Sequence, residues 1–150
     1  MTTIYFVTPA KEEEKKAIVT DFLKDQGIDV IFSSPYRSAV ETIREFGVEQ
    51  EIPMYVVSEF SEIEQNNEPF ETMEEVEERM IDGLAMLATN EEGKTIVVCT
   101  HPIALGSAIH YFDETFTEED TNQLKENAPS IVKFVLDGEI CKDIEVIKAI

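Results

Sequence analysis

Among the residues that could do chemistry, Glu62 and His101 have side chains that can exchange protons. A carboxylate that faces an imidazole is a workable pair for general acid–base catalysis. Two polar stretches, Thr8 to Ala10 and Ser33 to Ser38, could line the same site. Each of these groups lies at or beyond the end of an apolar segment. The arrangement of the strands and helices therefore determines whether these groups lie close together.

Apolar and amphipathic segments alternate along the chain. Short apolar runs bounded by polar residues indicate strands, and apolar residues that recur every three or four positions indicate helices. The pattern predicts strands at 4–7, 30–32, 54–57, 95–99, 131–136 and 140–147, and helices at 11–26, 34–47, 72–89, 102–111 and 117–127. The acidic stretch from 58 to 70 lacks periodicity and is expected to be a loop.

Helix-start and turn signals support these boundaries. Ser34 followed by Pro35 is typical of a helix start, because a proline in the first helical position loses no needed hydrogen bond. Residues 72–75 (Thr-Met-Glu-Glu) form a capping-box signature. Gly47 is expected to end the second helix, and residues 137–138 (Asp-Gly) predict a tight hairpin between the last two strands.

Alternating strands and helices followed by a terminal hairpin predict an α/β fold. We expect a single domain over residues 1–150, a three-layer sandwich with a mixed, mostly parallel sheet, helices on both faces and a C-terminal hairpin. In such sheets ligands bind beyond the carboxyl ends of the strands. This placement would gather Thr8 to Ala10, Ser33 to Ser38, Glu62 and His101 into one pocket.

Three sequence motifs carry a resemblance to a known family. They are Asp-Val-Ile-Phe-Ser-Ser-Pro-Tyr-Arg-Ser-Ala-Val-Glu-Thr at 29–42, Phe-Ser-Glu at 60–62, and Thr-Ile-Val-Val-Cys-Thr-His-Pro at 95–102. In this order and spacing they resemble the histidine phosphatase superfamily, the phosphoglycerate mutase-like fold, and especially its short bacterial members. The resemblance runs from end to end and includes a tail at 128–134 that looks like the family's closing strand.

The resemblance implies that the phosphatase chemistry is lost. In the family an Arg-His-Gly triplet follows the first strand: its histidine becomes phosphorylated, and its arginine, with a second arginine, clamps the phosphoryl oxygens. The matching positions here are Thr8, Pro9 and Ala10, with Ser38 in place of the second arginine. A proline has no lone pair to attack phosphorus, and phosphoryl transfer depends on cationic stabilisation of the oxygens.

Two family positions are retained. Glu62 matches the family's general acid, and His101 matches its second, phosphate-contacting histidine, although a hydrogen-bonded structural role for His101 stays open. Pro102 replaces a family glycine and removes a backbone N–H. Arg37 stands one position before Ser38, which turns it by about 100° on a helix. We expect it on the solvated surface, with a reach back into the pocket as the alternative.

We expect the pKa of His101 to be raised, because Glu62 should lie nearby in a strongly acidic protein. Its contribution to stability would then fade as the pH rises through the folded-state pKa.

Other chemistries have weaker support. Cys99 and His101 are two residues apart and could form a thiolate pair, but a cysteine inside an apolar strand is usually an inert thiol. The only histidines are His101 and His110, and the acidic runs lack calcium-loop spacing, so no metal and no cofactor is expected.

The chain has 150 residues and a formal charge of −20. A field of this sign repels nucleic acid, acidic membranes and free phosphate esters, so neither nucleic acid nor membrane is an expected partner. No apolar run approaches the roughly 20 residues that span a bilayer, and no signal segment opens the chain. With only two cysteines, we expect a reduced, cytoplasmic protein.

The expected function is that of a non-catalytic binding or regulatory pseudoenzyme. Its residual pocket would hold a small molecule or a protein partner, and a homodimer is compatible with the sequence. The expected ligand-binding residues are Thr8, Pro9, Ala10, Ser34, Arg37, Ser38, Glu62, His101 and Pro102. One alternative is a weak or altered phosphatase or hydrolase that uses Glu62, His101 and Arg37. Another is a structural subunit with an exposed aromatic patch formed by Tyr55, Phe60, Phe70, Tyr111, Phe112 and Phe116.

Overall fold

A six-stranded sheet runs through the centre of the molecule, in a computed structural model that describes residues 1–148. Its strands are β1 (Thr2–Val7), β2 (Val30–Ser33), β3 (Met54–Val56), β4 (Thr95–Cys99), β5 (Ile131–Asp137) and β6 (Ile140–Ile147), in the spatial order β3-β2-β4-β1-β5-β6. The pairs β2–β3, β2–β4 and β1–β4 are parallel, and β1–β5 and β5–β6 are antiparallel. This arrangement confirms the mixed, mostly parallel sheet and the terminal hairpin.

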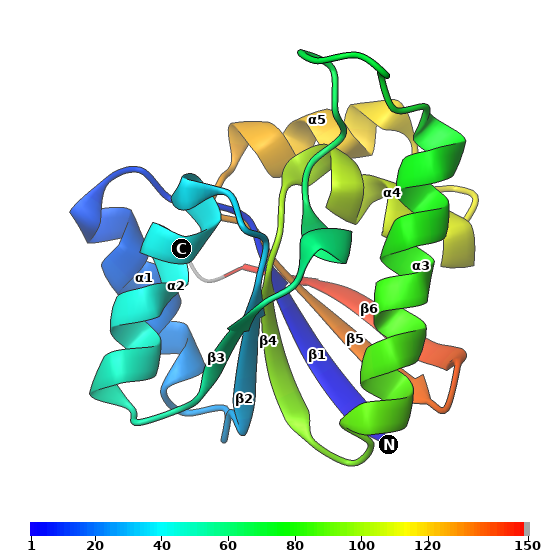
Figure 1. Cartoon of the computed structure of the whole chain (residues 1–150). Helices are drawn as coiled ribbons and strands as arrows, with labels where there is room; N and C mark the ends of the chain where they lie inside the picture. The colour runs from blue at the N-terminus through cyan, green and yellow to red at the C-terminus, as the bar shows by residue number, and fades with distance from the viewer. Residues whose placement is uncertain (149–150) are drawn as a thin grey trace.

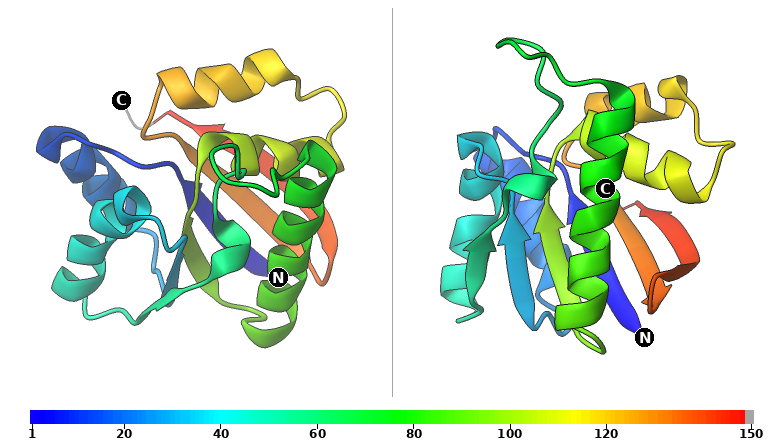
Figure 2. Two further views of the ribbon diagram at one scale, coloured as in Figure 1. Left: turned by 45° about the horizontal axis from the view of Figure 1, so that its top comes forward. Right: turned by 45° about the vertical axis from the view of Figure 1, so that its right-hand side comes forward.

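Helices cover both faces of the sheet (Figures 1 and 2). They are α1 (Glu13–Leu23), α2 (Arg37–Glu49), α3 (Met73–Asn90), α4 (Pro102–Phe112) and α5 (Glu118–Glu126), with a short 3-10 helix, η1 (Ser58–Phe60), before α3. α1 and α2 pack on one face, and α3, α4 and α5 on the other. The expected three-layer, single-domain α/β fold is therefore confirmed. No helix within residues 1–148 is both long and apolar enough to span a membrane.

The alternation of side chains along β1 divides the core in two. Ile4 and Phe6 point into the layer of α3, α4 and α5, whereas Tyr5 and Val7 point toward α1 and α2. Successive side chains of a strand lie on opposite faces, so a strand in mid-sheet must be apolar on both sides. β1 and the adjacent β4 meet this requirement and hold the centre of the sheet.

The second helix begins and ends later than its sequence signals predict. The Ser34 hydroxyl accepts the Tyr36 N–H at 3.1 Å and holds residues 34–36 in a turn, so α2 starts at Arg37 rather than at Pro35. Gly47 does not end the helix, which continues to Glu49. An added Cβ at Gly47 would lie 3.1 Å from the Ile31 side chain, so this glycine allows α2 to pack closely on β2.

The segment before α3 is held above the sheet. Thr72 accepts the Glu75 N–H while the Glu75 carboxylate accepts the Thr72 N–H, which confirms the predicted capping box. Between η1 and Thr72 the chain rises as a loop over the carboxyl ends of the parallel strands, at the top of Figure 1.

Thr8, Ser34 and His101 follow the ends of the neighbouring strands β1, β2 and β4, so the fold brings these three positions to one edge.

Candidate functional site at the carboxyl edge of the sheet

His101 lies at the centre of this edge. It is only 5% exposed, and its Nε2 is 2.8 Å from the Ser34 hydroxyl oxygen. The Tyr36 ring packs against the imidazole, with 4.8 Å between the ring centroids. Because Ser34 Oγ already accepts the Tyr36 N–H, its own proton can be donated to a neutral imidazole.

The expectation of a raised pKa for His101 is wrong. Burial, aided by the positive charge of Arg79, lowers the pKa of His101 to about 4. A buried imidazole loses the water that would solvate its cation, so the neutral form is favoured. His101 is therefore a neutral hydrogen-bonding group at physiological pH.

The end of β1 is tied to other backbone segments. Thr8 is fully buried, and its hydroxyl accepts the Ser130 N–H at 2.6 Å. Thr42 of α2 connects the following residues to that helix. Its Oγ accepts the Ala10 N–H at 2.9 Å and donates to the Ser38 carbonyl at 2.7 Å. These bonds place the chain at Pro9 and Ala10 beside the first turn of α2.

Glu62 holds the start of α4 through its carboxylate. Oε1 accepts the N–H groups of Ala104 at 2.8 Å and of Ile63 at 3.0 Å, and Oε2 accepts the Ile103 N–H at 3.0 Å. The first N–H groups of a helix have no partner within the helix and attract a negative charge. The Glu62 carboxylate supplies that charge, so both of its oxygens are occupied by hydrogen bonds that fix the start of α4.

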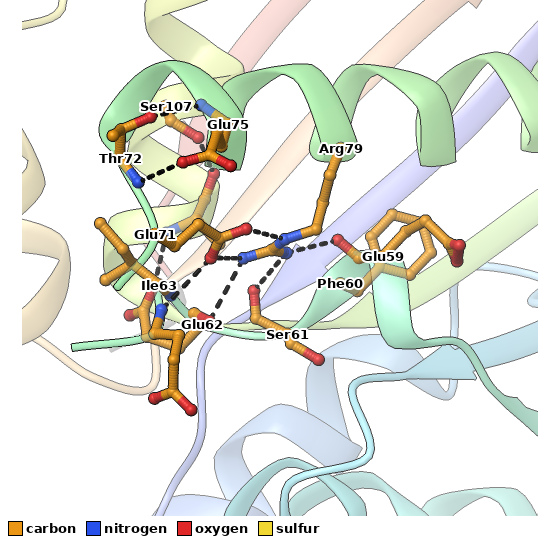
Figure 3. A network of polar contacts seen from close by, with 12 residues as sticks. Glu59, Phe60, Ser61, Glu62, Ile63, Glu71, Thr72, Glu75, Arg79 and Ser107 are labelled. Atoms are coloured by element: carbon orange, nitrogen blue, oxygen red, sulfur yellow. Dashed lines mark hydrogen bonds and ion pairs between the residues drawn. The ribbon is translucent and has the colours of Figure 1, made fainter. Parts of the chain in front are cut away.

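Arg79 of α3, which the sequence analysis did not single out, organises the loop that carries Glu62. Its Nε and one terminal nitrogen bind the two Glu71 carboxylate oxygens at 2.7 Å each (Figure 3). The other bonds go to the backbone carbonyls of Glu59 and Ser61 at 2.7 Å and of Glu62 at 3.2 Å. These contacts use all five donors of the guanidinium. The bonds from Arg79 also hold the pKa of the Glu71 carboxyl below its usual range.

One sequence signal could have identified Arg79. It is the only basic residue among the 18 residues of α3, where acidic residues surround it. A lone arginine in such a helix suggests a specific partner.

Three predicted site residues lie at the margin of this edge. Arg37 is on the exposed surface and binds Glu41, one turn along α2, at 2.7 Å. This is the solvated placement that we expect from the sequence. Ser38 is exposed in the first turn of α2, and Pro102 is the first residue of α4, following His101 at its N-cap.

A hollow of about 660 Å³ opens along the loop, and Tyr36, which packs on His101, is part of its wall. Glu62 is the predicted site residue that lines this hollow. Tyr36, Phe70 and Arg79 also line it. We call it the acidic hollow, after the six carboxylates at its wall: Glu59, Glu62, Glu64, Glu71, Glu75 and Asp82. Partial burial, with Glu64 and Glu62 nearby, raises the pKa of Tyr36.

The alternative chemistries find little support in the geometry. Cys99 is fully buried, and burial raises the pKa of its thiol, which keeps it protonated. The six aromatic residues form no single patch: Phe60 is core, Phe112 and Phe116 are half-buried, and only Tyr55, Phe70 and Tyr111 are exposed. Among residues 1–148, no group of three or more His, Cys, Asp or Glu side chains is placed to hold a metal ion.

Several solved structures share this fold. YhfR of Bacillus stearothermophilus is 16% identical, with a TM-score of 0.77 over 94% of each chain. Phosphoserine phosphatase from Entamoeba histolytica, solved with 3-phosphoglyceric acid, is 14% identical, with a TM-score of 0.76 over 99% of each chain. A putative alpha-ribazole-5'-P phosphatase from Escherichia coli is 11% identical, with a TM-score of 0.74 over 97% of this chain and 95% of its own. No curated protein sequence matches the chain.

The fold is that of the phosphoglycerate mutase-like α/β proteins. The sequence model of the histidine phosphatase superfamily (branch 1) matches residues 64–143, which is more than half of the 150 residues. The chain therefore belongs to that superfamily. The matched stretch contains His101 but not Thr8 to Ala10, Ser38 or Glu62.

Proposed function

We propose that this superfamily member is a non-catalytic binding or regulatory protein. The observation that carries the proposal is the end of β1, where the family resemblance calls for a nucleophile. Pro9 has no nucleophilic atom, and the neighbouring Thr8 hydroxyl is buried against Ser130. A phosphoenzyme intermediate needs a nucleophilic side chain at this point.

The two retained groups have structural partners. A general acid must carry a proton that it can deliver, but the Glu62 carboxylate accepts three backbone N–H groups. A phosphate-contacting histidine must reach the ligand, but His101 is covered by Tyr36 and Ser34. This supports the view that both groups are kept for the fold.

The acidic hollow indicates the kind of ligand that we propose. Six carboxylates line it, and the guanidinium of Arg79 has its five donors in use. Two like charges about 4 Å apart repel by roughly 4 kcal/mol at an effective dielectric near 20. An uncharged or cationic small molecule, or a protein segment of that character, is therefore the proposed occupant.

One observation favours the alternative of an altered hydrolase. The 2.8 Å contact between Ser34 and His101 has the geometry of a serine activated by a histidine base. However, Ser34 is fully buried and its oxygen accepts the Tyr36 N–H, so no substrate carbonyl can approach it. Arg37, the third member of the alternative site, pairs with Glu41 in solvent.

We expect negligible hydrolysis of p-nitrophenyl phosphate, because no nucleophile stands at Pro9. The assay uses protein free of contaminating phosphatase, with His101→Ala as the control. Steady turnover that disappears in this variant would support the enzyme alternative and contradict the proposal.

Restoring the family residues provides a second test. Thr8→Arg is unsuitable, because it would remove the partner of the buried Ser130 N–H. Pro9→His and Ser38→Arg can be combined instead, since Thr42 bridges the two segments that carry them. We expect vanadate to stabilise this double variant but not the parent, by about 2.7 kcal/mol at a hundredfold excess over its dissociation constant.

The matched control is Pro53→His with Thr89→Arg, which makes the same substitutions at exposed positions away from this edge. Equal stabilisation of the parent by vanadate would mean that its pocket already binds anions, against the proposal. A folded double variant that does not respond would mean that Pro9 and Ser38 do not face one pocket.

A further inference from the structure

A second hollow, of about 490 Å³, lies between α3, α4 and α5 on the helical layer. Its lining residues are all different from those of the acidic hollow. Ile103, Gly106 and His110 follow one another at intervals of three and four residues, so one stripe of α4 forms the floor. Met73 of α3 and Phe116, just before α5, form apolar parts of the walls.

The floor of this hollow is rigidly built. A Cβ added at Gly106 would collide with the Thr121 side chain, so α4 and α5 cross here in direct contact. His110 Nδ1 lies 2.8 Å from the Phe116 carbonyl oxygen, which fixes the ring and ties the α4–α5 connection to α4. Met73 is nevertheless 53% exposed, so the apolar wall on the α3 side faces solvent.

A second cavity lies further along α3 and shares no lining residue with this hollow. This smaller cavity, of about 130 Å³, is lined by Ile81, Leu84 and Ala85 of α3 and by Tyr111 and Phe112 at the end of α4. Met73, Glu77, Ile81 and Leu84 recur every three or four residues, so both cavities open along one face of α3. From Met73 to Ala85 this face is about 18 Å long at 1.5 Å per residue. We call the two cavities, together with the face of α3 that lines both, the α3–α4 groove.

The charges of the groove have one sign. Glu74, Glu77 and Glu118 stand at the wide end, and Glu139 stands at the narrow end. None of the described residues that line either cavity is a lysine or an arginine. The groove thus offers an apolar centre between two acidic ends.

We propose that the α3–α4 groove is a docking site for an amphipathic, basic helix of a partner protein. The occupant would place an apolar stripe of about three turns, matching the 18 Å groove, against α3 and α4. Lysine or arginine residues at both ends of the stripe would face Glu74, Glu77, Glu118 and Glu139. A second copy of this chain is a poor occupant, because each copy carries −20 and the field of one repels the other.

A synthetic helix tests this site directly. The probe is a peptide of about 18 residues with leucine on one face, lysine and arginine on the other, and a single tryptophan in the apolar stripe. The protein contains no tryptophan, so the emission reports the peptide alone. The control peptide has the same composition in scrambled order, which keeps the charge but removes the stripe.

The variant Glu74→Gln/Glu77→Gln/Glu118→Gln removes charge from the wide end of the groove. The matched control, Glu45→Gln/Glu49→Gln/Glu92→Gln, removes the same charge from exposed positions elsewhere. We expect the groove variant to bind the peptide about tenfold more weakly, and the control variant to change binding by less than about twofold. Met73→Gln should also weaken binding, because it removes apolar contact without changing charge.

Amide chemical shifts locate the bound peptide. We expect the changes to centre on residues 73–85 and 103–118. Equal affinity for the scrambled peptide, shift changes confined to the acidic hollow, or no binding by the amphipathic peptide would each overturn the proposal. None of these results depends on ligand binding in the acidic hollow, so the proposed function is tested separately.

Discussion

His101 is buried beside a serine hydroxyl and an aromatic ring rather than beside a free carboxylate. The carboxylate that the sequence suggests as its neighbour, Glu62, is directed at the start of α4 instead. The net charge of the whole protein therefore matters less to His101 than the few groups that enclose it. Desolvation is the largest cause of its lowered pKa.

We expect an NMR titration to place the pKa of His101 near 4. Between that pKa and the ordinary histidine pKa of 6.5, the unfolded chain binds a proton that the folded chain does not. Stability from this source is therefore fully present above about pH 6.5 and is lost as the pH falls toward 4, by about 3 kcal/mol. This direction is opposite to the sequence-based expectation.

His101→Asn separates this effect from the titration of the many carboxylates. The difference in unfolding free energy between parent and variant should shrink as the pH falls from 6.5 to 4. A constant difference over this range, or a measured pKa above 6.5, would contradict the burial argument.

The sequence predicts which residues reach the edge of the sheet better than it predicts what they contact. Hydrophobic patterning predicts where the strands end. The adjacent positions of β2, β4 and β1 in the sheet, which bring Thr8, Ser34 and His101 together, are given by the structure. That Thr8 turns inward to Ser130 depends on side-chain packing between segments 122 residues apart. A pattern of neighbouring residues cannot predict such a contact. It cannot predict the hydrogen bonds from the N–H groups of α4 to the Glu62 carboxylate either.

Arg79 of the neighbouring helix joins the two ends of the loop between η1 and α3, in addition to the hydrogen bonds between Glu64 and Glu71 inside the loop. Arg79 binds Glu71 at the end of the loop and three carbonyls at its beginning. The lack of periodicity in the sequence predicts a loop at 58–70. Residues 61–70 are irregular as predicted, whereas residues 58–60 form η1, and the pattern does not predict that the loop is held in place. Order comes from α3, whose capping box fixes where Arg79 stands relative to the loop.

We expect Arg79→Met to destabilise the protein by about 3 kcal/mol, because it leaves Glu71 and the loop carbonyls partly buried without their donor. Arg79→Lys should recover only part of the loss, since an ammonium cannot form the two parallel bonds to Glu71. Denaturant unfolding measures the loss, and amide hydrogen exchange should show faster opening of residues 61–72.

Arg44→Met is the control for this variant, because Arg44 is an exposed arginine on α2. Equal stability of Arg79→Met and Arg44→Met would show that the loop is held by other contacts.

The charge of the whole molecule has a thermodynamic consequence. With −20 on 150 residues, repulsion between carboxylates opposes the folded state, and only five ion pairs occur among residues 1–148. Added salt shortens the screening length from about 30 Å at 0.01 M to about 10 Å at 0.1 M. We expect potassium chloride to raise the free energy of unfolding by on the order of 1 kcal/mol over this range.

Chloride is preferable to sulfate in this measurement, because sulfate also strengthens apolar burial. A fall in stability with added chloride would mean that attractive pairs such as Arg79–Glu71 outweigh the repulsion.

The central position of β1 also governs how the chain can fold during its synthesis. β1 is made first, yet it pairs with β4 and β5, and its end is fastened to Ser130. Contacts between residues so distant in sequence form slowly, because a long loop must close before they contribute. An emerging chain that stops before β4 holds β1, which lies at the centre of the finished sheet, without a partner strand on either side. The N-terminal half should therefore stay unfolded and prone to association until residues 95–136 are available.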